Sequence, residues 1–70
     1  MKEIYKSGKM VRYKTDKGNK VEVYKERIGG KTFWFVGFVT KDKIINANKD
    51  FDYKKDAIAY AKRVVKKKGW

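Results

Sequence analysis

Apolar and polar residues alternate along much of the first two thirds of the chain, as in strands that bury one face. Four segments carry this pattern or a dense apolar run: residues 10–15, 21–28, 31–39 and 44–48. Polar or glycine-containing connections separate them, as expected between antiparallel strands. We therefore predict an antiparallel sheet of three to four strands over residues 10–48. Residues 1–9 are less clearly patterned and form either an arm or an edge strand.

The connections between these segments set the register of the predicted strands. Asp16-Lys17-Gly18 suits a three-residue hairpin turn with a left-handed glycine, and Gly29-Gly30 suits a two-residue turn with positive φ at both positions. A four-residue loop after Val39 then pairs Phe38 with Ile45 and Val36 with Ala47. Directly paired residues share a face of the sheet, and a slip of one residue would exchange the two faces. The predicted core face consists of Val11, Tyr13, Val21, Val23, Trp34, Val36, Phe38, Ile45 and Ala47.

In the last third of the chain, apolar residues recur every three or four positions, which predicts a helix over residues 52–68. Asp52 is the expected N-cap, since its carboxylate can accept hydrogen bonds from first-turn amides, and Gly69 is the expected stop. Phe51 should close the corner between sheet and helix, while Trp70 should fold back onto the sheet edge or the helix end. The apolar helix positions are Tyr53, Ala57, Ile58, Ala61, Val64 and Val65. The chain is thus predicted to be one α+β domain, a sheet with a single C-terminal helix on one face.

Aromatic side chains are also expected on the opposite sheet face, where no second layer is predicted. Tyr24 lies opposite Phe35 in this register, and Arg12 lies opposite Glu22 as a cross-strand ion pair. Exposed rings among basic residues and asparagines indicate an interaction surface. Rings stack on bases, lysine and arginine neutralise phosphates, and asparagine can pair with adenine. The candidate nucleic-acid-binding residues are Arg12, Lys14, Lys20, Tyr24, Lys31, Phe33, Phe35, Asn46 and Asn48.

The same rings fit a second hypothesis, in which they pack against protein. The partner would be a second copy of the chain, the N-terminal arm, or a host enzyme that a phage-type inhibitor binds. Under this hypothesis Tyr24, Phe33 and Phe35 form an apolar interface.

Composition favours a polyanionic partner. Lys and Arg number 20 against 8 Asp and Glu, a net charge of +12. Part of this charge is a basic run, Lys62, Arg63, Lys66, Lys67 and Lys68, which is either a solvated helix end or a second place of phosphate contact.

Other functional classes find little support in the sequence. The chain has no Cys and no His, so it lacks the residues of disulfides, thiolate catalysis and the commonest zinc sites. The aspartates fit turns and the helix entry, and no phosphate-binding loop or nucleophile–base pair is recognisable. We expect no enzymatic activity, cofactor or metal. No apolar run is long enough to span a bilayer, and Met1–Lys6 lacks a signal core, so we expect a cytoplasmic protein without membrane contact.

Residues 10–65 resemble a known type of DNA-binding domain. The order of strands, short strand and helix, with the helix entry Phe51-Asp52-Tyr53-Lys54-Lys55-Asp56-Ala57, is similar to the sheet-plus-helix domains at the N-termini of tyrosine-type integrases and to plant ethylene-response-factor domains. In those families the sheet lies in the major groove. The resemblance implies DNA rather than RNA as partner, with Arg12, Lys14, Tyr24 and Phe35 in contact with it.

Overall fold

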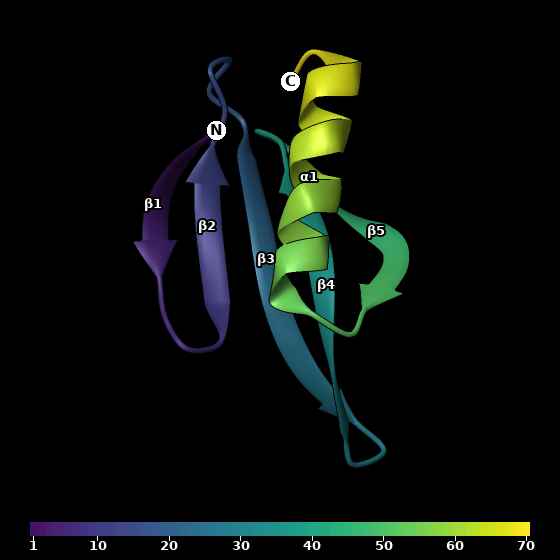
Figure 1. Ribbon diagram of the computed structural model, residues 1–70. Helices are drawn as coiled ribbons and strands as arrows, with labels where there is room; N and C mark the ends of the chain where they lie inside the picture. Colours follow the sequence, from purple (N-terminus) through teal and green to yellow (C-terminus); the bar gives the residue numbers. More distant parts are fainter.

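The computed structural model describes all residues from 1 to 70 and contains a five-stranded antiparallel sheet with one helix on one face (Figure 1). The elements are β1 (Lys2–Lys6), β2 (Met10–Lys14), β3 (Lys20–Ile28), β4 (Lys31–Val39), β5 (Ile44–Phe51) and α1 (Lys54–Lys68). Each strand pairs with the next one along the chain. The predicted α+β class is confirmed, but the sheet has five strands because residues 2–6 form an edge strand.

The predicted register holds from β2 to β4. Val23 pairs with both Val11 and Val36, and Tyr24 pairs with Phe35. The turns are those expected, with φ of 85° at Gly18 and of 59° and 81° at Gly29 and Gly30. These backbone conformations suit glycine because it has no Cβ to clash. The turns therefore fix which side chains share a face.

The pairing of β4 with β5 departs from the prediction after its first part. Phe38 pairs with Ile45 as expected, but the register then shifts and Phe35 pairs with Asp50. Residues 47–49 lie opposite the single residue Val36, so the predicted pair of Val36 with Ala47 is replaced by a bulge. Because the bulge adds an even number of residues, alternation resumes in phase and Phe51 reaches the core side opposite Trp34.

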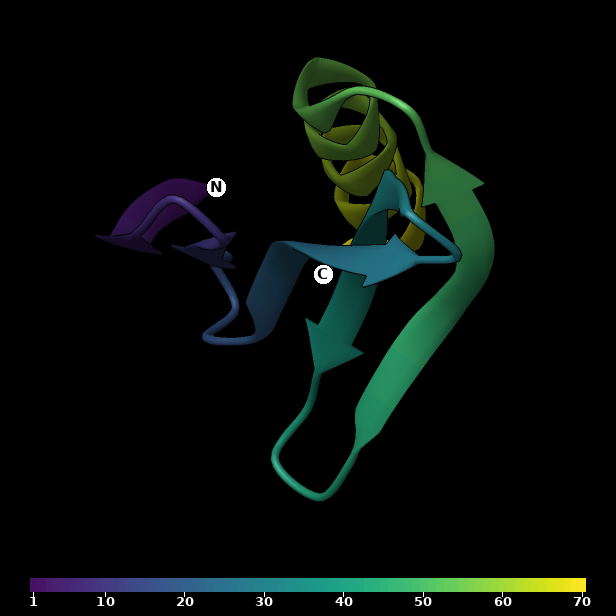
Figure 2. The same ribbon diagram turned by 90° about the horizontal axis from the view of Figure 1, so that it is seen from below.

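The core lies between the sheet and α1, as Figure 2 shows. Its buried apolar residues are Val11, Tyr13, Val21, Val23, Val36, Phe38, Ala57 and Ala61. The two alanines have no side chain beyond Cβ, which lets the helix approach the sheet closely. Trp34 and Ala47 are half-buried against this cluster. Ile45 was predicted in the core but is 42% exposed, because β5 is an edge strand with no element beyond it.

The start of the helix differs from the prediction. Strand β5 runs to Phe51, and the N-cap is Tyr53, which is extended with φ −126° and ψ 140° and makes no side-chain capping bond. Asp52 is therefore not the cap, and its carboxylate lies 3.8 Å from Lys31 Nζ. Tyr53 was predicted on the apolar helix face but is 63% exposed.

The end of the helix agrees with the prediction. Gly69 adopts the left-handed conformation with φ 67°, and the amide of Trp70 donates to the carbonyl of Val65 at 3.0 Å. The Trp70 ring packs edge-on against Phe38 with centroids 5.5 Å apart. The helix is too short and too polar to cross a bilayer.

Candidate nucleic-acid interface

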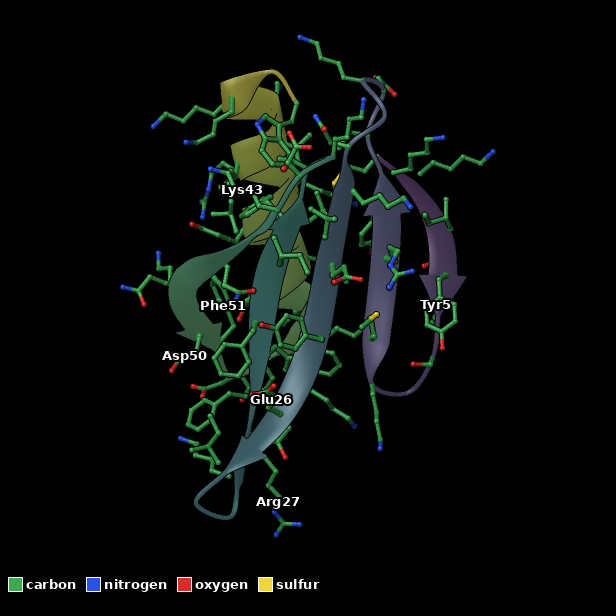
Figure 3. All side chains as sticks on the ribbon, turned by 180° about the vertical axis from the view of Figure 1, so that it is seen from behind. Tyr5, Glu26, Arg27, Lys43, Asp50 and Phe51 are labelled. Carbon is green, nitrogen blue, oxygen red and sulfur yellow. The ribbon has the colours of Figure 1, made fainter.

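The sheet face turned away from α1, here called the open face, is covered by no other element (Figure 3). Strand alternation places most of the predicted binding residues on it. They are Arg12, Lys14, Lys20, Tyr24, Lys31, Phe33, Phe35 and Asn46. Asn48 is the exception in register, since it lies within the bulge of β5. It still comes near the others, because it lines a shallow pocket of about 330 Å³ together with Phe35 and Asp50.

Tyr24 and Phe35 form a ring pair at the centre of the open face. Their centroids are 5.8 Å apart with an angle of 27° between the planes, and both side chains are half-buried. The Tyr24 hydroxyl donates to Asn46 Oδ1 at 3.3 Å. Gly37 leaves room for this contact, because a Cβ there would lie 3.2 Å from Asn46 Oδ1 and 3.7 Å from Tyr24 Cε1. Stacking, hydrogen bond and glycine together hold the pair in one orientation.

Carboxylates border this ring pair. Burial raises the pKa of Tyr24 above its usual value, and the nearby Glu26 and Glu22 raise it further. The hydroxyl is therefore protonated at neutral pH and able to donate to Asn46. Asp50 lies directly opposite Phe35 on β5. Any partner of the rings thus meets negative charge on more than one side.

Arg12 is held by neighbours within the protein. Its Nε lies 2.7 Å from Glu22 Oε2, which confirms the predicted cross-strand ion pair. Its guanidinium also lies 5.8 Å from the centroid of the Tyr5 ring and reaches Met10 Sδ at 3.9 Å. Glu22 offsets the charge that Arg12 would present to a phosphate. Tyr5 was missed by the sequence reasoning, because the register of β1 is irregular between Glu3 and Tyr5 and gives no clear alternation. Met10 was missed too, although the regular alternation of β2 places it on the same face as Arg12.

Lys31 and Phe33 occupy the far end of β4. Lys31 Nζ lies 5.2 Å from the centroid of the Phe33 ring and 3.8 Å from Asp52. Lys31 and Asp52 are largely solvent-exposed, so this ion pair is screened and weak. Lys31 therefore stays accessible to an external anion.

A row of lysines crosses the other end of the open face. Lys2 pairs with Lys14, and Lys14 pairs with Lys20. All three lysines are exposed, and none of them takes part in either of the two ion pairs of the structure. Lys20 lies four residues from Tyr24 along β3, a separation of roughly 13 Å. The open face therefore combines a basic row with a ring cluster, formed by Tyr24, Phe33 and Phe35, in which Tyr24 lies about 13 Å from Lys20.

Comparisons with protein-family models, with curated proteins and with solved structures found no significant match. The resemblance to integrase and ethylene-response-factor domains therefore stays a prediction. The chain contains no group of three or more His, Cys, Asp or Glu side chains arranged to hold a metal ion. What the geometry offers is a fixed pair of rings, an amide and several free ammonium groups on one open surface.

Proposed function

We propose that this protein binds nucleic acid, without catalysing a reaction, through the open face of its sheet. The observation that carries the proposal is the fixed, half-exposed ring pair of Tyr24 and Phe35 on a face that no other element covers. Bases that stack on such rings contribute about 1–3 kcal/mol each. The lysine row would neutralise phosphates of the same nucleic-acid strand whose bases stack on the rings. The net charge of +12 would accelerate the association of the protein with that strand.

The ring cluster favours unpaired bases. An exposed ring can stack only on a base whose face is free, and in a duplex the bases already stack on each other. Asn46 keeps its amide nitrogen available for a base edge, because its oxygen accepts from Tyr24. The partner we propose is single-stranded nucleic acid, with DNA ahead of RNA only by the resemblance.

The test is a salt titration with labelled single-stranded DNA, the RNA of the same sequence and the DNA duplex. Binding should weaken steeply with salt, because neutralised phosphates release counterions. A protein that binds none of the three at the lowest salt would contradict the proposal.

The contribution of the rings is measured with Tyr24→Leu. This change keeps apolar area on the sheet but removes the stacking surface, so single-strand affinity should fall about 5- to 150-fold. Tyr53→Leu is the matched control, because Tyr53 is 63% exposed and lies at the helix entry, away from the open face. The two variants should share the wild-type salt slope, since neither changes charge. If Tyr24→Leu and Tyr53→Leu bind single-stranded DNA with equal affinity, the Tyr24 ring does not contribute to the site.

A second candidate function is protein binding by the same rings. It is favoured by the carboxylates around them, since Glu22, Glu26 and Asp50 would repel phosphates. Ile44 adds apolar surface next to Gly37 and is 63% exposed. If the protein is a dimer in solution, and Tyr24→Leu yields a monomer with unchanged nucleic-acid affinity, the rings form a protein interface.

A further inference from the structure

The outer surface of α1 carries a concentration of positive charge that the open face does not use. Seven of the fifteen helix residues are basic and one is acidic, so this element alone holds +6 of the net +12. Ala57 and Ala61 mark the side buried against the sheet. The side turned to solvent, here called the outer helix surface, carries five exposed cations, Lys55, Lys62, Arg63, Lys66 and Lys67, together with the exposed Asp56 and Ala59.

Local helix electrostatics account for only part of this charge. The negative end of the helix dipole stabilises cations in the last turn, and these are Lys66, Lys67 and Lys68. Lys62 and Arg63 lie more than one turn from that end, where the effect has faded. Lys55 lies in the first turn, where a cation is unfavourable. The dipole therefore does not explain the positive charge on most of the helix length.

The outer helix surface also carries unrelieved repulsion. Lys62 and Lys66 are four residues apart, as are Arg63 and Lys67, and like charges at this spacing destabilise a helix. The two ion pairs of the structure lie elsewhere, so none of these four cations has a carboxylate within ion-pair distance. An external polyanion would relieve this repulsion when it binds.

A turn far away in the sequence extends the basic surface. Lys17, between β2 and β3, reaches the end of the helix, with its Nζ 3.7 Å from the position of a Cβ at Gly69. Lys17, Lys62 and Lys66 line one pocket of about 460 Å³, together with the carboxylate of Asp16. The fold thus brings lysines from two elements to one groove beside the helix.

We propose that the outer helix surface binds the phosphate backbone of a nucleic-acid duplex, independently of base sequence. From Lys55 to Lys67 the helix rises about 18 Å, along which a duplex presents a phosphate charge every ~1.7 Å. Cations dominate this surface, and the two rings beside it each have a cation 5.8 Å from the ring centroid, Lys55 at Tyr53 and Arg63 at Tyr60. Such a surface suits a phosphate backbone better than a stacked base. It does not suit a bilayer, because the apolar residues of α1 are packed against the sheet.

The two nucleic-acid surfaces lie on opposite sides of the molecule (Figure 2). If the open face holds a single strand, as the proposed function states, one molecule can hold a single strand and a duplex at the same time. This bridging activity rests on the proposed function, whereas duplex binding by the outer helix surface does not.

The first experiment compares two double variants of equal charge. Lys62→Gln/Lys66→Gln removes two cations of the outer helix surface, and Lys6→Gln/Lys9→Gln removes two exposed cations around the β1–β2 connection. Glutamine has a helix propensity similar to that of lysine, so α1 should stay intact. The helix variant should make the salt slope for duplex binding shallower by about 1.8, and the control should leave it unchanged. Equal slopes for the two variants would overturn the proposal.

The second experiment tests bridging, with single-stranded DNA fixed to beads and a labelled duplex in solution. Wild-type protein should carry the duplex onto the beads. Tyr24→Leu should lose this capture but keep duplex affinity in solution, and Lys62→Gln/Lys66→Gln should lose capture but keep single-strand affinity. If wild-type protein binds each DNA alone but never both together, bridging is refuted. If it binds the duplex but no single strand, the proposed function fails while the outer helix surface stands.

Discussion

Removing the carboxylate of Glu22 should strengthen nucleic-acid binding. Glu22 lies next to the ring pair and holds the guanidinium of Arg12, with Nε at 2.7 Å from its Oε2. Glu22→Gln keeps the shape of the side chain but removes a negative charge from the open face and leaves Arg12 free to contact a phosphate. The side chains of Arg12 and Glu22 are 38% and 15% exposed, so water screens the pair only in part, and losing it should cost about 1–3 kcal/mol of folding stability.

The expected magnitude follows from counterion release. One additional phosphate contact should steepen the salt slope on single-stranded DNA by about 0.7. The gain in affinity over the wild type should therefore shrink by about 2.6-fold between roughly 50 and 200 mM salt. Fluorescence anisotropy of a labelled oligonucleotide at several salt concentrations measures both quantities.

Glu3→Gln is the matched control, since it changes the net charge by the same amount. Glu3 is exposed and pairs with Tyr13, which places it on the core side of the sheet. The salt slope of Glu3→Gln on single-stranded DNA should equal that of the wild type. Equal slopes for Glu22→Gln and Glu3→Gln would refute a phosphate site around Arg12, as would weaker binding by a folded Glu22→Gln protein.

Three further predictions concern stability and its dependence on pH. Tyr53 caps α1 without a side-chain bond, so Tyr53→Ser should be about 1 kcal/mol more stable than Tyr53→Ala in urea unfolding, and equal stabilities would place the helix start elsewhere. Ala61 is fully buried where α1 meets the sheet, so Ala61→Leu should lose about 1–3 kcal/mol by overpacking, while Leu at the exposed Ala59 of the same helix should be nearly neutral. Burial raises the pKa of both Tyr13 and Tyr24 above the usual value of 10. Glu3 adds to the pKa rise at Tyr13, and Glu26 and Glu22 add to it at Tyr24. Above about pH 10 the unfolded chain loses these protons before the folded one, so the free energy of unfolding should fall as pH rises past that point. Tyr13→Phe or Tyr24→Phe should reduce this fall, and an unchanged fall in both variants would mean that these hydroxyls titrate normally.

Most of the sheet could be predicted because its information is local. Gly18 and Gly29-Gly30 define tight turns, and a tight turn fixes which residues face each other across a hairpin. Alternation then assigns each side chain to a face, which correctly gave the Val23–Val36 core pair and the Tyr24–Phe35 ring pair. The candidate site followed from the same register.

Errors arose where a longer-range balance decides the structure. The bulge of β5 moves Asn48 out of register with Phe35 and lets Phe51 reach the core side. The burial of Phe51 stabilises this arrangement, but the residues of the bulge themselves give no sign of it. Strand β5 also continues to Phe51, so Asp52 comes too early to cap the helix. In both places the local signal was outweighed by burial of an aromatic side chain against the helix.

The amino-acid sequence by itself determined the α+β class, the hairpin turns, the register of β2 to β4 and the pairing of Arg12 with Glu22, because each depends on neighbours or on the period of a strand. Only the tertiary structure decided how the positive charge is distributed in space. It placed Asp52 beside Lys31 and brought Lys17 to the end of α1, and it turned Lys62 and Lys66 away from the open face. The reason is that charges interact through space, so their grouping depends on how the sheet and the helix pack.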